Sequence, residues 1–307
     1  MARPDASTPL RSMLFTPGSS EKMLARAPTS GADAALFDLE DSVAAGMKEK
    51  ARELVREAIG ATKAAAGAPA AILVRVNGAE SGLLEGDLDA VAVEGLDGIF
   101  LPKPESAADI RKADAILTRL ERERGLEGGS VGIIAQIESA RGVYCCHEMC
   151  VASPRVVGVN FGSAEDADLC RDLGAQWTPD GLTLLYARSK ALLDARAAGL
   201  PHPTDGVYMR LNDDAGCRAD AEIAKRIGYV GKAAIHPRQV PIFNAVFSPK
   251  PEEVAYYREM VETFREGERA GLGAVTFQGK MIDLAMARHA ERVLARAQAI
   301  ASRGAGN

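Results

Sequence analysis

Short apolar segments recur along this chain, and a stretch that favours a helix follows each of them. Most of the apolar segments lack alternating polar residues, which is the pattern of strands that are buried on both faces of a parallel sheet. The stretches between them are rich in Ala, Leu, Glu, Lys and Arg, which favour helices. The pattern predicts strands at residues 12–17, 34–40, 71–77, 98–103, 131–138, 156–162, 204–208 and 232–237.

Repeated strand–helix alternation of this length favours a closed (β/α)8 TIM barrel, an α/β fold that typically needs about 250 residues. The chain has 307 residues, so it is long enough for this fold. The alternative is an open doubly wound sheet, which usually carries a glycine-rich phosphate turn after its first strand. The segment TPGSSEK in that place is only a weak version of such a turn. The barrel is therefore our prediction.

The chain continues beyond the last predicted strand for longer than one barrel helix requires. Residues 238–244, 251–270 and 281–302 have a helical composition, and no further strands are expected there. We therefore predict two domains. The barrel occupies residues 1–245, and a C-terminal helical extension over residues 246–307 acts as a lid.

Charge and hydropathy exclude several classes of protein. The formal net charge is −5, with 37 Lys and Arg against 42 Asp and Glu, so no basic surface for nucleic acid is expected. The sequence has no run of about 18 apolar residues and no secretory signal pattern, so we expect no membrane span. The five cysteines are then expected to be reduced thiols of a cytoplasmic protein.

Charged side chains gather where the predicted strands end, which in a barrel is the face that carries an active site. Glu40 and Asp41 follow the second strand, Arg75 lies in the third, Glu138 ends the fifth, and Asp166 follows the sixth. Carboxylates without convergent His or Cys suit a hard cation, and Mg²⁺ typically takes one or two of them. We expect Glu138 and Asp166 to bind Mg²⁺ directly. Glu40 and Asp41 would orient its waters and Arg75.

Some of these residues also have a structural interpretation. Carboxylates in such loops often cap helices or form surface ion pairs, and Arg75 in an apolar strand would pair with Glu40 or Asp41. An arginine has enough donors to do this and also to stabilise a developing oxyanion. Lys22 and Arg26, after the first strand, could bind phosphates near a helix N-terminus or form a solvated helix face.

A series of motifs, in order, gives nearly the whole chain a resemblance to a known family. They are RSMLFTPGSS, FDLEDSV, VRVNG, LPKPES, AQIESARGV, NFGSAED, GKAAIHPRQ and GKMIDLA. The chain resembles the citrate lyase beta-subunit-like enzymes of the HpcH/HpaI aldolase superfamily, which include malyl-CoA and citramalyl-CoA lyases. The resemblance implies a (β/α)8 barrel with Mg²⁺ held by Glu138 and Asp166. It also implies that Arg75 contacts the reacting oxygens and that Lys22 and Arg26 lie near the phosphates of coenzyme A.

The implied reaction cleaves a malyl- or citramalyl-type 3-hydroxyacyl-CoA thioester to a 2-oxo acid and acetyl-CoA. Asp283 would transfer the proton at the enolate carbon, closing over a neighbouring subunit of a homo-oligomer such as a trimer or hexamer. A cap for the helix that begins near Leu284 is the other interpretation of Asp283. The segment NFGSAEDADLCRDLG is longer than the family pattern, so Glu165 could replace Asp166 as the metal ligand.

Three other functions remain open at this point. The chain could be the beta subunit of a citrate lyase complex, which acts on a citryl-acyl-carrier-protein thioester. It could be a thioesterase that hydrolyses malyl-CoA on the same scaffold. It could also be a binding or scaffold protein without activity, although the complete set of Arg75, Glu138, Asp166 and Asp283 argues against this.

Overall fold

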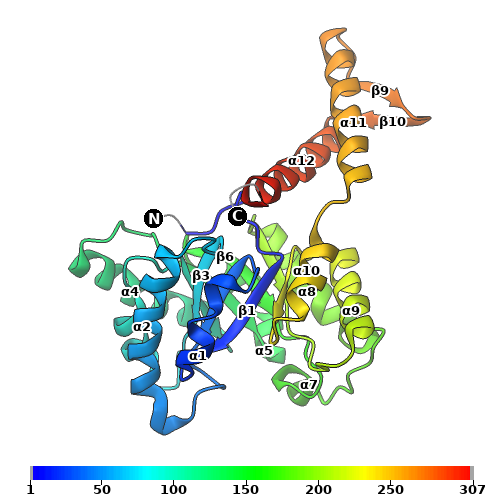
Figure 1. The fold of residues 1–307 in the computed structure, drawn as a ribbon. Coiled ribbons are helices and arrows are strands. Elements are labelled where there is room, and N and C mark those ends of the chain that lie inside the picture. Colours follow the sequence, from blue (N-terminus) through cyan, green and yellow to red (C-terminus); the bar gives the residue numbers. More distant parts are fainter. Residues whose placement is uncertain (1–2, 305–307) are drawn as a thin grey trace. The chain divides into compact units, whose positions relative to one another are not determined.

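A computed structural model describes residues 3–304 of the protein. The chain divides into two compact units, Met1–Phe247 and Ser248–Asn307. The first unit is a closed barrel of eight parallel strands, in which each strand pairs with the next and β8 pairs with β1 (Figure 1). The strands are β1 (Ser12–Pro17), β2 (Ala34–Asp38), β3 (Ala71–Arg75), β4 (Gly98–Pro102), β5 (Gly132–Ile137), β6 (Val156–Phe161), β7 (His202–Asp205) and β8 (Lys232–Ala234).

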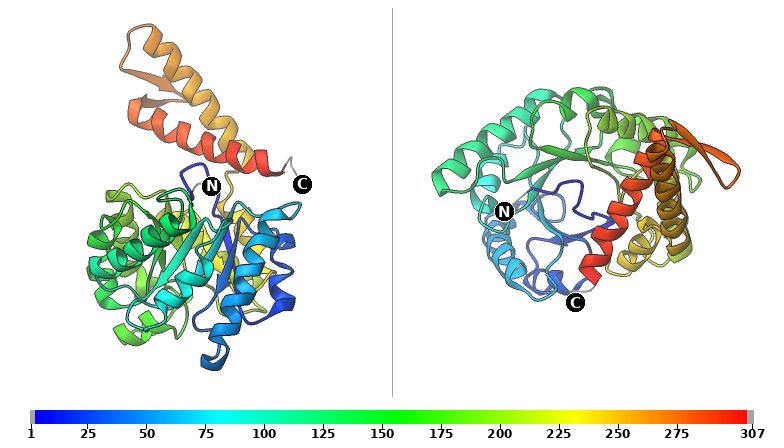
Figure 2. Two further views of the ribbon diagram at one scale, coloured as in Figure 1. Left: turned by 90° about the vertical axis from the view of Figure 1, so that its left-hand side faces the viewer. Right: turned by 90° about the horizontal axis from the view of Figure 1, so that it is seen from above.

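Helices connect the strands and surround the barrel, as Figure 2 shows from two directions. The longer ones are α2 (Lys48–Ala64), α3 (Leu84–Val91), α4 (Ala107–Arg124), α8 (Leu185–Ala197), α9 (Asp214–Ile227) and α10 (Gln239–Phe247). The shorter ones are α1 (Glu21–Leu24), α5 (Ala140–Tyr144), α6 (Cys146–Cys150) and α7 (Asp168–Leu173), with 3₁₀ turns η1 (Ala27–Thr29), η2 (Ala45–Met47) and η3 (Leu182–Leu184). In the described part of the chain, no helix is long and apolar enough to cross a membrane.

Alternation along the strands separates an inner core from an outer one. Ala34 and Leu36 of β2 belong to a small cluster that also holds Leu73, Phe100 and Ile134, whereas the residues between them pack in the larger cluster that the helices share. Because side chains on a strand alternate with a period of two, the inner series on each strand can be extended to its carboxyl end. On β2, β3 and β5 these series reach Asp38, Arg75 and, just beyond β5, Glu138 in the order of the sequence.

The second unit consists of α11 (Pro251–Arg269), α12 (Leu284–Gly304) and an antiparallel hairpin of β9 (Ala274–Phe277) and β10 (Lys280–Asp283). Gln278 and Gly279 at its turn have φ values of 46° and 76°, which is typical of a tight hairpin turn. The unit has a small core of its own around Phe264, Phe277 and Ile282.

The expectation that no strand follows the barrel is therefore wrong. The hairpin strands have four residues each and are largely exposed, so they lack the apolar run by which the barrel strands were recognised.

The predicted barrel is confirmed, and the open doubly wound sheet is excluded because β8 pairs with β1. The first strand has the predicted bounds, but most others end one to three residues early, since their last polar residues belong to the loops. The seventh strand lies at His202–Asp205 rather than at residues 204–208. Its sequence, HPTD, is buried without being apolar, so hydropathy placed the strand too late.

Candidate active site

Arg75 is held at the mouth of the barrel by one carboxylate at the end of the neighbouring strand β2 and by another just after it. Its guanidinium donates from Nε and Nη2 to the two oxygens of Asp38, at 2.7 Å each. Nη1 lies 3.0 Å from Glu40 Oε2, and the guanidinium carbon is 4.7 Å from the centre of the Phe15 ring. Burial alone would lower the pKa of Arg75, but its carboxylate neighbours raise it above the usual value. The ion-pair interpretation of Arg75 is confirmed, and the guanidinium is fixed in a single direction.

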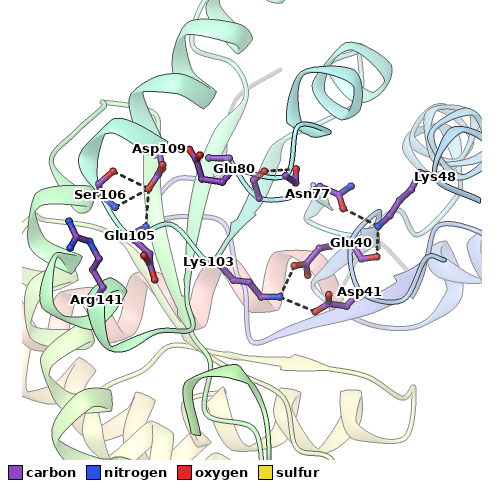
Figure 3. Close-up of a pocket in the computed structure, with 13 residues that line it drawn as sticks. Glu40, Asp41, Lys48, Asn77, Glu80, Lys103, Glu105, Ser106, Asp109 and Arg141 are labelled. Atoms are coloured by element: carbon purple, nitrogen blue, oxygen red, sulfur yellow. Dashed lines mark hydrogen bonds and ion pairs between the residues drawn. The ribbon is translucent and has the colours of Figure 1, made fainter. Parts of the chain in front are cut away.

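Lys103, directly after β4, joins carboxylates from two other loops. Its Nζ lies 3.0 Å from Glu40 and 3.4 Å from Asp41, both after β2, and 3.0 Å from Asp168 at the start of α7. Figure 3 shows the ammonium pointing at Glu40 and Asp41. The backbone of Lys103 has a φ of 52°, which is uncommon for a residue with a Cβ. Lys103 therefore occupies a strained position that links three strand ends.

Glu138 has one carboxylate oxygen that is buried and can still accept a hydrogen bond or bind a cation. Its Oε1 accepts a hydrogen bond of 2.7 Å from Gln136 Nε2, whereas its buried Oε2 has no hydrogen-bond partner. Burial raises the pKa of Glu138 to about 7, although the charge of Arg75 opposes this shift. Gly162, after β6, allows the close approach, because a Cβ there would lie 2.8 Å from Glu138 Cγ. The site thus contains a carboxylate that is costly to ionise until a cation reaches it.

The neighbours Glu165 and Asp166 have different environments. Glu165 accepts two hydrogen bonds from Arg210, at 2.9 and 2.7 Å. The exposed Asp166 has a left-handed backbone, with a φ of 54°. Within residues 3–304 no hydrogen bond or ion pair of its carboxylate is present. Glu165 is therefore occupied by an arginine, and Asp166 is the carboxylate of this loop that is available to a ligand.

The donor set fits a hydrated divalent cation. In the described residues no three His, Cys, Asp or Glu side chains form a ready-made metal group, but Mg²⁺ needs only one or two carboxylates and completes its shell with water and substrate oxygens. Three buried side-chain oxygens at the barrel mouth also lack a hydrogen-bond or ion-pair partner within residues 3–304. They are Gln136 Oε1, Glu138 Oε2 and Ser163 Oγ. A cation with its waters would supply the missing partners, which buried polar atoms normally have.

A cavity of about 620 Å³ opens beside this cluster, among the loops that follow β2 to β5 (Figure 3). Lys103, Glu40 and Asp41 form part of its wall, and the rest comes from Lys48, Asn77, Gly78, Ala79, Glu80, Ser81, Glu105, Ser106, Asp109 and Arg141. Its volume is within the range of small-molecule sites. The predicted residues Glu40 and Asp41 therefore line a cavity, whereas Glu138 and Asp166 are not among its lining residues.

Lys22 and Arg26 lie on the same side of the barrel, in and just after α1, which follows β1. Both side chains are exposed. Neither side chain forms a hydrogen bond or an ion pair within residues 3–304, so both are open to solvent. This placement leaves both earlier interpretations possible, a phosphate contact and a solvated face.

Asp283 lies in the second unit, at the junction of β10 and α12. Its Oδ1 accepts hydrogen bonds from the backbone N–H groups of Ala285 and Met286, at 3.0 and 3.1 Å. The capping interpretation of Asp283 is therefore confirmed. Capping occupies one carboxylate oxygen, so it does not exclude a further role.

Sequence reasoning missed several members of the cluster. Asp38, rather than Glu40 or Asp41, is the bidentate partner of Arg75, and the register that pairs these two residues across β2 and β3 was the missing information. Gln136 and Ser163 look like ordinary strand and loop residues. One signal in the sequence could have identified Gln136. It lies midway between Ile134 and Glu138, two residues from each, and therefore on the same inner face of the strand.

The family is decided by comparison with known proteins. Residues 11–237, which include all eight strands of the barrel, match the HpcH/HpaI aldolase/citrate lyase family. This chain belongs to that family. Its barrel and its enzyme class, that of the aldolases and lyases, follow from membership.

Relatives in the HpcH/HpaI family match the chain along almost its full length. The citrate lyase subunit beta of Haemophilus influenzae is 38% identical over 290 residues, which cover 94% of this chain and 97% of the relative. A (3S)-malyl-CoA thioesterase of Cereibacter sphaeroides is 36% identical over 294 residues, 96% of each chain. The similarity therefore includes the second unit as well as the barrel.

Solved structures show the same fold. The protein CitE from Mycobacterium tuberculosis, in complex with magnesium, acetoacetate and coenzyme A, is 29% identical and has a TM-score of 0.72 over 96% of this chain and all of that one. A citrate lyase from Burkholderia xenovorans, with 20% identity, has a TM-score of 0.80 over 96% of this chain and 95% of that one. The second likeness supports the fold alone.

Proposed function

We propose that the chain is a Mg²⁺-dependent carbon–carbon lyase that cleaves a malyl- or citramalyl-type 3-hydroxyacyl-CoA thioester to a 2-oxo acid and acetyl-CoA. One observation carries the proposal. The buried carboxylate of Glu138, with its unpartnered Oε2, lies near a guanidinium, Arg75, that two other carboxylates hold in place. The Mg²⁺, acetoacetate and coenzyme A bound by the CitE protein of Mycobacterium tuberculosis support this choice of ligands.

In this proposal Glu138 and Asp166 hold Mg²⁺, which would supply Lewis-acid polarisation of the substrate oxygens. Glu40 and Asp41 orient water and keep Arg75 in position. The 3-hydroxyl gives its proton to water and becomes the carbonyl of the 2-oxo acid as the C2–C3 bond breaks. The electron pair of that bond forms the enolate of acetyl-CoA. Arg75, with a fixed guanidinium, stabilises the negative charge that develops on oxygen.

Two further groups complete the reaction. Asp283 gives a proton to the enolate carbon in cleavage and removes it in condensation. Lys22 and Arg26 bind the phosphates of coenzyme A as exposed cations. The enzyme is a homo-oligomer, such as a trimer or hexamer, in which Asp283 of one subunit serves the barrel of another.

Two relatives support alternative reactions on the same scaffold. The citrate lyase subunit beta of Haemophilus influenzae points to a citryl-acyl-carrier-protein thioester, and the enzyme of Cereibacter sphaeroides points to hydrolysis of malyl-CoA. The products separate them. A thioesterase releases free malate, a lyase releases acetyl-CoA and glyoxylate, and a complex subunit needs its carrier protein.

A mass-spectrometric screen tests the proposal. The protein is incubated with malyl-, methylmalyl-, citramalyl- and citryl-thioesters, with Mg²⁺ and with excess chelator. We expect acetyl-CoA and a 2-oxo acid from the malyl- or the citramalyl-thioester, or propionyl-CoA and glyoxylate from the methylmalyl-thioester, and only with the metal. Free hydroxy acid as the sole product, or no turnover of any thioester, would overturn the lyase proposal.

Substitution of the ligands tests the site itself. Glu138→Ala and Asp166→Ala should each abolish metal-dependent turnover and leave the circular dichroism spectrum unchanged, because each removes a metal-binding oxygen from a folded barrel. Glu165→Ala is the comparison variant. It removes no proposed metal ligand but releases Arg210, so turnover should fall without being abolished. If Glu165 alone is essential, the assignment of Asp166 is wrong.

Mixing two inactive variants tests the shared active site. Glu138→Ala subunits supply an intact Asp283, and Asp283→Asn subunits supply an intact barrel. Under conditions in which subunits exchange, the mixture should recover part of the activity. A mixture that exchanges, as shown by labelled subunits, but stays inactive would place Asp283 in its own chain or in a capping role only.

A further inference from the structure

The loop that carries Asp166 is tied down on both sides of that residue. We call residues 162–167, between β6 and α7, the Asp166 loop. On one side Glu165 pairs with Arg210, whose guanidinium carbon also lies 5.2 Å from the centre of the Trp177 ring. On the other side Asp168, the first residue of α7, lies 3.0 Å from Lys103 Nζ. Asp166 itself stands between the two ion pairs with no partner of its own within residues 3–304.

The backbone adds a second, independent observation. Asp166 has a φ of 54° and Lys103 a φ of 52°, and these are two of the three non-glycine residues with positive φ in the described part of the chain. Such conformations cost of order 1–3 kcal/mol and persist only where the surroundings fix them. The two strained residues therefore belong to one set of contacts, because Lys103 pairs with Asp168 at the end of the Asp166 loop.

We propose that Lys103 and Arg210 are positioning residues, which hold the Asp166 loop from opposite sides and thereby aim the Asp166 carboxylate at the metal. This inference rests on the proposed metal site. Lys103 performs a second task, because it also holds Glu40 at 3.0 Å. Its ammonium thus sets the distance between the strand end of β2 and the loop after β6. Partners that orient metal ligands typically contribute about 10- to 100-fold to metal affinity.

The sign of the change in metal affinity separates positioning from simple charge. Lys103 is a cation close to a cation site, as its effect on the ionisation of Glu138 indicates. If it acted only through its charge, removing it would tighten the binding of a divalent cation, because like charges repel. If it positions Asp166, removing it weakens that binding. An ordinary surface ion pair, worth about 0–1 kcal/mol of stability, would leave the affinity unchanged.

The experiment titrates the metal-free protein with Mn²⁺ and follows free Mn²⁺ by electron paramagnetic resonance, without substrate. For Lys103→Met and for Arg210→Gln we expect the Mn²⁺ dissociation constant to rise about 10-fold or more. Lys103→Arg should recover most of the loss at Lys103, and Arg210→Lys should recover only part, because Lys cannot form the two-bond contact with Glu165.

Arg119→Gln is the matched control. Arg119 also bridges two carboxylates, Glu85 and Glu123, at 3.0 Å each, and its side chain is 39% exposed against 38% for Lys103. It lies on α4, in the outer layer, so its loss should leave the Mn²⁺ dissociation constant unchanged. Circular dichroism of every variant confirms the fold, and the conservative Lys103→Arg and Arg210→Lys variants extend the test if either primary variant fails to fold.

Two results would overturn the inference, and a third would show that the proposed metal site itself is wrong. An unchanged or lower dissociation constant in both folded variants would show that Lys103 and Arg210 do not position the ligand. A loss in Arg119→Gln equal to that in Lys103→Met would make the effect a general one. If Glu138→Gln and Asp166→Asn also leave Mn²⁺ binding unchanged, then the proposed metal site is wrong as well.

Discussion

Two clusters of charged side chains lie in the barrel, and they differ in how completely they are buried and paired. The seam cluster, between β7, β8, α8 and α9, has two cations and two carboxylates. Arg188 and Lys232 each contact both Asp205 and Asp220, and all four residues are buried. In the described chain none of its buried side-chain atoms lacks a partner. This closed set balances its charge and leaves nothing for a ligand.

The mouth cluster, which consists of Asp38, Glu40, Arg75, Lys103 and Glu138, is not balanced in this way. Its three carboxylates face two cations. Glu40 Oε2 lies 3.0 Å from Arg75 Nη1, but Glu138 Oε2 has no hydrogen-bond partner. A buried polar atom without a partner costs about 1–3 kcal/mol. The comparison indicates that the seam cluster holds the barrel together, whereas the mouth cluster maintains an unfavourable arrangement that a bound cation would relieve.

The seam cluster matters because little else joins β7 to β8. Their ladder has one registered pair, Asp205 with Lys232. Lys232→Met should therefore lower the free energy of unfolding by about 3–5 kcal/mol, because it leaves two carboxylates buried with one cation. Urea unfolding measures the change. The double variant Lys232→Met with Asp220→Asn should recover part of the loss, and a double variant as unstable as the sum of the single ones would remove the idea of a coupled cluster.

Arg75→Lys, in the mouth cluster, should reduce turnover more than stability, whereas Lys232→Met in the seam cluster should mainly reduce stability. Lys keeps the charge but cannot reach both oxygens of Asp38 and a substrate oxygen at once. We expect turnover to fall by about 10²- to 10³-fold, as for the loss of one oxyanion donor. Steady-state kinetics and thermal unfolding are measured together. Near-normal turnover with a large loss of stability would place Arg75 with the seam cluster.

Glu138→Gln should stabilise the metal-free protein at high pH. The pKa of Glu138 is raised to about 7, so the folded state binds its proton more tightly than the unfolded state does. Stability from this group is therefore full below pH 4.5 and is lost as the pH rises to about 7. Replacing it should add about 2–3 kcal/mol at pH 8 and nothing at pH 4. A destabilised variant at pH 8 would mean that the carboxylate is paired after all.

Of these substitutions, those of Asp283 should have the smallest effect on stability. Asn is as good an N-cap as Asp, so Asp283→Asn should leave the melting temperature unchanged, whereas Asp283→Ala should cost about 1 kcal/mol. If Asp283 transfers the proton, both variants lose the carbon–carbon step equally. A fully active Asp283→Asn enzyme would give Asp283 a purely structural role, as in the seam cluster.

The sequence contained most of the barrel but only part of the site. Apolar runs located seven of the eight strands, because buried parallel strands need few polar residues. They failed at β7, where His202 and Asp205 are buried although polar, and Asp205 is paired with Arg188 and Lys232 from other elements. The hairpin of the second unit was not predicted for the opposite reason. Its strands are largely exposed, and its turn is Gln–Gly rather than the more recognisable Asn–Gly.

At the site, residues at the ends of strands or directly after them could be found from their position. Arg75 and Glu138 were predicted in this way, and their roles stay predictions that the experiments above address. Asp38 and Lys103 could not be assigned partners from the sequence, because their partners depend on strand register and on three loops meeting in space. The more a residue's role depends on neighbours from other strands and loops, the less of that role could be predicted from the sequence.

The left-handed backbone at Asp166 limits which amino acids evolution can place there. Gly, Asn and Asp tolerate such a φ at low cost, and larger side chains do so less readily. Of these three, only Asp carries a negative charge. A random library at this position, sorted first for folding, would be enriched in those three residues, and a second selection for turnover would leave Asp. Glu, with the same charge and one more methylene, would already be less frequent after the first step, so the backbone favours Asp over Glu before the metal does.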